Sequence, residues 1–128
     1  MLLHARSLWG RFFVFEHPAT AKSWQTDVVR NVMAMHGVRV ATFDQCCYGL
    51  VGPSGRPMRK RTKFLTNCGF VHKEFDGRYC ACTQPHQQII GSDLGEPLAA
   101  WAALYPPRLC RALAQCVKDR RSVQSEMI

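Results

Sequence analysis

Two short β-rich runs flank one amphipathic helix near the start of the chain, and this pattern limits the possible folds more than any other feature. Residues 12–15 are all apolar, which is typical of a strand that is covered on both faces. Residues 23–36 repeat apolar side chains at helical spacing, with Ser23 as the N-cap and Gly37 as the stop. Residues 38–43 predict a second strand. A strand, a helix and a strand in this order place their strands parallel, so the sequence predicts an α/β fold.

Polar side chains follow both predicted strands directly. Glu16 comes after the first strand, and Asp44 and Gln45 come after the second. The carboxyl ends of parallel strands meet at one edge of a sheet, so these three residues form the candidate catalytic site. A carboxyl group there can act as a general acid or contact a bound base. Helix capping, an ion pair or loop hydrogen bonds are the alternative roles.

A run of cations leads into a third predicted strand at residues 64–67. The whole chain has 17 Lys and Arg against 9 Asp and Glu, a net charge of +8, which favours a polyanionic partner. The sequence therefore predicts DNA or RNA binding, with a solvated basic loop as the alternative. The candidate nucleic-acid-binding residues are Arg56, Arg59, Lys60, Arg61 and Lys63.

The chain contains 7 cysteines, an odd number, and 47% hydrophobic residues, enough for a packed core. Both properties argue against a secreted disulfide framework, so we expect reduced thiols. We expect an intracellular protein because no apolar run could span a bilayer and residues 1–6 lack a signal-peptide core. Cys46 and Cys47 are interpreted as buried thiols, with a nucleophile as the alternative. Four residues offer tetrahedral zinc ligands, although Cys-x-Cys is not the usual zinc knuckle, and the default expectation is that no metal binds. These four are Cys68, Cys80, Cys82 and His86.

The rest of the chain carries weaker signals. Residues 68–95 predict an irregular segment containing Cys and Gly, with 88–90 as the only apolar core candidate. Pro106 and Pro107 open a predicted helix that ends at Lys118. One domain over 1–118 and a frayed tail over 119–128 follow from this pattern.

We expect no membrane partner, because no apolar run reaches the roughly 20 residues that a bilayer requires. An unpaired strand at the sheet edge predicts self-association.

Several short motifs, in this order and spacing, resemble a known family over nearly the whole chain. They are Phe15-Glu16-His17-Pro18 with Ser23-Trp24, Asp44-Gln45-Cys46-Cys47-Tyr48-Gly49, and Lys60-Arg61-Thr62-Lys63-Phe64-Leu65-Thr66-Asn67. Together they resemble the C-terminal half of a DNA cytosine methyltransferase-like domain as found in phage. With Tyr105-Pro106-Pro107-Arg108-Leu109-Cys110 added, the chain also resembles segments of retroelement-type polyproteins of protists.

This resemblance implies a partial Rossmann-like sheet, of the class I methyltransferase-like kind, with flanking helices. It also implies that Glu16 contacts a target cytosine. The chain departs from the family pattern, because His17 replaces an asparagine and no stretch before Phe12 matches the loop that binds S-adenosylmethionine. We therefore expect a degenerate, non-catalytic fragment from a mobile element that needs no cofactor and binds nucleic acid weakly. The alternatives are the base-recognition half of a methyltransferase, which would need a missing cofactor-binding segment, and a small zinc-binding interaction module.

Overall fold

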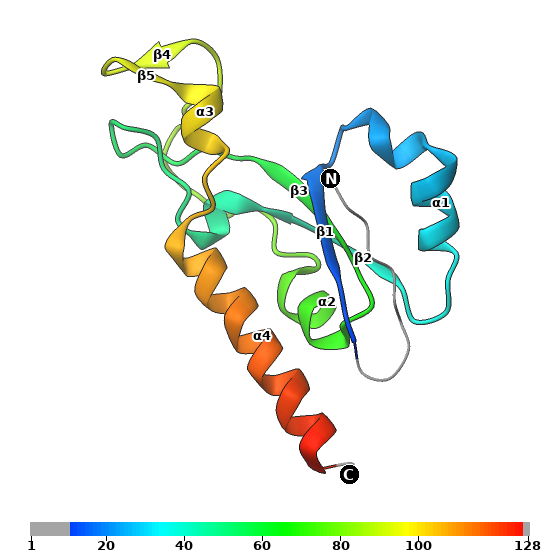
Figure 1. Ribbon diagram of the computed structural model, residues 1–128. Coiled ribbons are helices and arrows are strands. Elements are labelled where there is room, and N and C mark those ends of the chain that lie inside the picture. The colour runs from blue at the N-terminus through cyan, green and yellow to red at the C-terminus, as the bar shows by residue number, and fades with distance from the viewer. Residues whose placement is uncertain (1–10, 127–128) are drawn as a thin grey trace.

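The computed structural model describes residues 11–126 and forms a mixed α/β fold (Figure 1). Four α-helices, a three-stranded sheet, a short hairpin and two 3-10 turns make up this part of the chain. In chain order the elements are β1 (Val14–Pro18), η1 (Lys22–Gln25), α1 (Asp27–Met33), β2 (Arg39–Asp44), η2 (Gln45–Tyr48), β3 (Arg61–Thr66), α2 (Gly69–Phe75), β4 (Ser92–Asp93), β5 (Glu96–Pro97), α3 (Leu98–Ala102) and α4 (Pro107–Glu126).

The main sheet has the strand order β1-β3-β2, and β3 pairs antiparallel with both neighbours. β1 and β2 therefore run in the same direction, as the strand-helix-strand pattern predicts, but β3 lies between them. A Rossmann-like sheet would instead pair parallel strands. The α/β class is confirmed and the expected parallel pairing is not observed. The difference arises because β3, which begins at Arg61 within the basic run, returns between the other two strands.

The sheet buries a different cluster on each face. On one face, α2 and α4 cover an aromatic group of Phe43, Phe64, Phe75 and Tyr48, whose ring centroids lie 4.8–5.7 Å apart in the closest pairs. On the other face, η1 and α1 cover Phe15 and Leu65. Figure 1 shows α1 on one side of the sheet and α2 with α4 on the other. The sheet thus separates two apolar clusters, and a third, smaller cluster contains Leu50, Met58 and Ala102.

Several helix boundaries differ from the sequence-based expectation. α1 begins only at Asp27, because the Thr26 side chain accepts a hydrogen bond from Val29 N and caps the helix there. The preceding turn, η1, places Trp24 in the core. α4 continues to Glu126, so the helix does not fray after Lys118.

The segment that the sequence predicts to be irregular contains a helix, α2. Its buried residues Val71 and Phe75 are one turn apart, and they pack against the aromatic group. From Tyr79 to Gly91 the chain does run without helix or strand. Ile90 is exposed rather than in the core, so the expected apolar core candidate at 88–90 is wrong for this residue.

The two edge strands of the main sheet are β1 and β2. Along its outer edge, β2 bonds to the chain after α2, since Gly77 N donates to Thr42 O and Asp44 N donates to Arg78 O. Edge-to-edge self-association through β2 is therefore blocked at this end of the strand. Among the helices described, none is long and apolar enough to cross a membrane.

We predict that Phe43→Ala destabilises the protein by about 3–5 kcal/mol, because it removes a ring from the centre of the aromatic group and leaves a cavity. Phe43 has 0% exposure and packs on three other rings. Urea unfolding followed by circular dichroism measures the change. Val28→Ala is the matched control: Val28 is 66% exposed on α1, and its loss should cost less than about 0.5 kcal/mol. Equal effects of the two substitutions would contradict the core assignment.

Candidate metal centre

Three cysteines and one histidine meet at one end of the sheet. The ligand atoms of Cys46, Cys80, Cys82 and His86 all lie within 4.8 Å of one another. Cys46 comes from the turn η2 directly after β2, and the other three come from the irregular segment after α2. The site therefore joins two parts of the chain that are more than thirty residues apart in sequence.

The spacing of these atoms suits a tetrahedral metal. Zinc bonds of about 2.3 Å to sulfur and about 2.0–2.1 Å to nitrogen place neighbouring ligand atoms somewhat under 4 Å apart. Cys80 Sγ lies 3.2 Å from His86 Nε2, so this pair already has a separation close to that of two ligands. Cys82 N also donates to Cys80 Sγ, at 3.4 Å. Only small side-chain adjustments are needed to enclose an ion.

The Asp44 carboxylate holds the metal-ligand segment to the sheet. It is fully buried and accepts a hydrogen bond from Cys80 N to Oδ2 at 2.8 Å. Arg61 donates to the same carboxylate from Nε at 3.0 Å and from Nη2 at 3.1 Å. Burial opposes the ionisation of Asp44, but the hydrogen bonds from Arg61 and Cys80 outweigh it and lower its pKa. A charged Asp44 therefore connects β2, β3 and the backbone of one ligand.

Further hydrogen bonds fix the two ends of the site. At the end nearer α2, Cys47 Sγ contacts Arg78 O at 3.4 Å. At the other end, Gln87 N donates to Pro57 O at 2.9 Å, directly after the ligand His86. The Gln87 side chain also accepts a hydrogen bond from Arg56. The ligand segment is thus attached on both sides of the cysteine-histidine cluster.

Cys68 is not part of the site, although the sequence places it with Cys80, Cys82 and His86. It lies in the core cluster under α2 and α4, and it is 1% exposed. Cys46 takes its place. Sequence spacing could not show this exchange, because the approach of η2 to the later segment depends on the pairing of β2 with residues 76–78. Cys46 is buried, as the sequence predicts. It is not only a core thiol, because its sulfur also lies within 4.8 Å of the three other candidate ligand atoms.

The three candidate catalytic residues do not form one site. β3 separates Glu16 from Asp44, and the strand register puts them on opposite faces, since Glu16 pairs with Phe64 and Asp44 pairs with Arg61. Glu16 instead lies near Tyr105, whose pKa is raised by burial and by this carboxylate. Gln45 is buried and donates from Nε2 to Thr62 Oγ1 at 3.0 Å.

The side chains of the five candidate nucleic-acid-binding residues do not share one direction. Lys60 turns toward α3, where its Nζ donates to Ala102 O at 3.1 Å. Arg61 pairs with Asp44, and Lys63 Nζ lies 5.7 Å from the centre of the Trp24 ring. Arg56 contacts Gln87, and Arg59 is exposed beside the metal centre. The five cations therefore do not form one basic loop: Arg56, Arg59 and Lys60 precede β3, whereas Arg61 and Lys63 belong to it.

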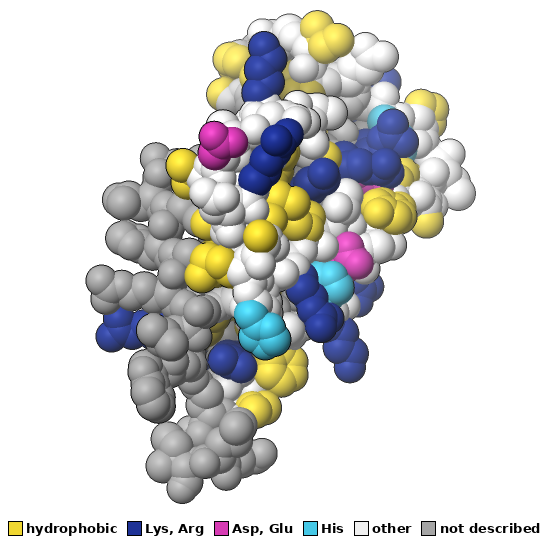
Figure 2. Space-filling model, turned by 90° about the vertical axis from the view of Figure 1, so that its right-hand side faces the viewer, with side chains coloured by type: hydrophobic (Ala, Val, Ile, Leu, Met, Phe, Trp, Pro, Cys, Tyr) yellow, Lys and Arg dark blue, Asp and Glu magenta, His cyan; other side chains and the backbone are white. Residues whose placement is uncertain are grey.

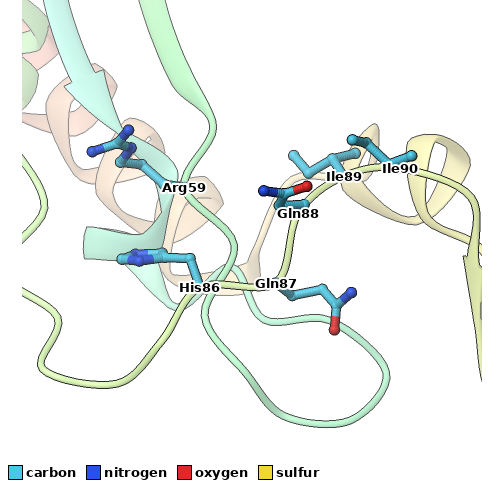
Figure 3. A pocket seen from close by; sticks show the side chains of 6 residues that line it. All are labelled: Arg59, His86, Gln87, Gln88, Ile89 and Ile90. Atoms are coloured by element: carbon cyan, nitrogen blue, oxygen red, sulfur yellow. The ribbon is translucent and has the colours of Figure 1, made fainter.

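A surface pocket of about 600 Å³ adjoins the metal centre through His86. Its lining residues are Arg59, His86, Gln87, Gln88, Ile89 and Ile90. Figure 3 shows the Arg59 and His86 side chains projecting to the same side, whereas Gln87 points away from them. The pocket thus places a cation next to one metal ligand.

Comparisons with known proteins give no relative: no family model, no curated protein and no solved structure matches the chain. A function must therefore be argued from the geometry of the site.

We predict that Asp44→Asn weakens metal binding and lowers the free energy of unfolding by about 1–3 kcal/mol, because a neutral amide loses the charge-assisted bonds with Arg61. Competition with a chromophoric chelator measures the affinity, and thermal unfolding measures the stability. Glu96→Gln, an exposed change of the same charge in the β4–β5 hairpin, should alter neither quantity. An Asp44→Asn protein that binds metal as tightly as the parent would contradict this role.

Proposed function

We propose that this protein is a small zinc-binding interaction module. The observation that carries the proposal is the convergence of Cys46, Cys80, Cys82 and His86, with all ligand atoms within 4.8 Å. Free cysteines are common in protein cores, but three thiols and an imidazole at this separation are the donor set of a structural zinc site.

The donor set favours zinc over other ions. Thiolate sulfur is a soft ligand that selects zinc over calcium or magnesium, which prefer oxygen. Four protein ligands also complete the tetrahedral coordination sphere of a zinc ion. A catalytic zinc site keeps one position for water or substrate, so the proposed role of this ion is structural.

Zinc would hold in place a ligand segment that has no helix or strand of its own. Residues 79–91 form no helix or strand, and most of their side chains are exposed. Such a segment gains little from apolar burial to offset its conformational entropy. A zinc ion that joins it to η2 converts metal-binding free energy into folding free energy. The result is a rigid loop beside the sheet, which can serve as a surface for a partner.

The methyltransferase-like alternatives have no comparable support in the geometry. A base pocket would require Glu16, Asp44 and Gln45 to face one space, but Glu16 and Asp44 lie on opposite faces of the sheet. Asp44 is also already saturated by Arg61 and Cys80. The zinc module is therefore the function that we propose.

Zinc content of the purified protein tests the proposal. We expect one zinc ion per chain by elemental analysis in the parent, and loss of tight binding in Cys46→Ser and in His86→Ala. Two substitutions act as controls. Cys110→Ser removes an exposed thiol on α4, and Cys68→Ala removes the core thiol that the sequence offers as an alternative ligand. Both should retain zinc.

Two results would overturn the zinc proposal. One is a folded parent protein that binds no zinc when refolded in its presence. The other is a Cys46→Ser protein that binds zinc as tightly as the parent.

A further inference from the structure

Three cations lie at alternate positions on or just before β3. They are Arg59, Arg61 and Lys63, and we refer to them as the basic row. Residues two apart on a strand point to the same face and are separated by about 6.6 Å. The ion pair of Arg61 with Asp44 and the contact of Lys63 with Trp24 place these two on the α1 side of the sheet. Figure 2 looks onto this side of the molecule, where Lys and Arg side chains occur in both the upper and the lower part of the view, with one group at the upper right.

Only half of this sheet face is covered. The cluster under η1 and α1 contains Phe15, Leu65 and Val40, which lie toward the end of β3. The half near the start of β3 carries His17, Lys63 and the exposed Arg61 instead. The accessible groups in this half are therefore the basic side chains themselves, because Arg59 and Arg61 are exposed whereas Asp44, which pairs with Arg61, is fully buried.

An exposed aromatic ring borders the basic row. Tyr79 is 51% exposed, and the Arg61 guanidinium carbon lies 4.7 Å from the ring centre. One face of the ring is thus supported by a cation, and the side chain still has a large accessible surface. Tyr79 directly precedes the ligand Cys80, so zinc binding would fix its backbone.

We propose that this half of the sheet binds a single-stranded nucleic acid, with phosphates at Arg59 and Lys63 and one base stacked on Tyr79. The proposal names the partner of the zinc module, and it rests on that module because zinc fixes the segment carrying Tyr79. Cations that follow the backbone and an aromatic ring that stacks on a base are the recurring elements of single-strand recognition. Duplex DNA has no free base face to offer Tyr79.

The charge of the surface limits the strength of binding. Asp44 balances Arg61, and a zinc ion held by three thiolates and one neutral imidazole has one net negative charge. Arg56, Arg59 and Lys63 exceed this charge by two. Binding should therefore involve few phosphates and depend modestly on salt, with about 0.7 in the logarithmic salt slope for each phosphate contact to a single strand.

Fluorescence polarisation with a labelled oligothymidylate across a salt series tests the proposal. Arg59→Gln/Lys63→Gln should reduce the salt slope by about 1.4, which corresponds to two lost contacts. Arg111→Gln/Lys118→Gln is the matched control, because it removes the same charge from exposed positions on α4 and should leave the slope unchanged. Tyr79→Ala should weaken binding at least about fivefold, and Tyr79→Phe should retain it.

The proposal is overturned if the two double variants lower the salt slope equally, or if duplex DNA binds as tightly as the single strand. Unchanged affinity in Tyr79→Ala would overturn it as well. Heparin that binds equally well and independently of Tyr79 would also overturn it, since heparin has no bases. Zinc content is measured on every sample. A zinc-loaded protein that does not bind the oligonucleotide contradicts only this proposal. A protein without zinc that binds it through Tyr79 contradicts the zinc module and the role of zinc in fixing Tyr79, but not the contact of Tyr79 with a base.

Discussion

The buried carboxylate of Asp44 is the interaction on which the candidate metal centre depends. It ends β2, receives both hydrogen bonds of Arg61 from β3, and accepts the backbone N–H of the ligand Cys80. Its own backbone N–H donates to Arg78 O, at the start of the ligand segment. A buried charge is costly unless it is paired and hydrogen-bonded, so the charged Asp44 carboxylate depends on Arg61 and on the N–H of Cys80. The end of the sheet and the first of the proposed zinc ligands are thereby held in one arrangement.

The fold divides its stabilisation between two kinds of interaction. Over the middle of the sheet, α2 and α4 bury the aromatic group around Phe43, and apolar packing is sufficient there. The segment at 79–91 lies outside this cluster, and its side chains contribute little to the core. Small domains commonly compensate for a limited core with a metal or with disulfides. All seven cysteines are free thiols, and a zinc ion held by three of them is the stabilisation that we propose for this segment.

The sequence predicted the elements near the start of the chain better than their arrangement. Local patterns indicate β1, α1 and β2, but strand order depends on where β3 inserts, and a basic run contains no signal for that position. α2 was missed because only Val71 and Phe75 give it a helical apolar spacing within seven residues. Three of the four proposed metal ligands stand close together in the sequence, but their Cys-x-Cys spacing is not that of a usual zinc knuckle, so the sequence offers them only as an alternative. The fourth, Cys46, is brought to them only by tertiary contacts.

X-ray absorption at the zinc K-edge of the zinc-loaded protein distinguishes the proposed thiolate site from zinc bound elsewhere. We expect a first shell of three sulfur atoms at about 2.3 Å and one imidazole nitrogen at about 2.0–2.1 Å. In Cys46→Ser loaded with excess zinc, the shell should lose one sulfur. A shell of oxygen and nitrogen alone would contradict the account, because it would place zinc on surface histidines and carboxylates. A shell that keeps three sulfurs in Cys46→Ser would also contradict it.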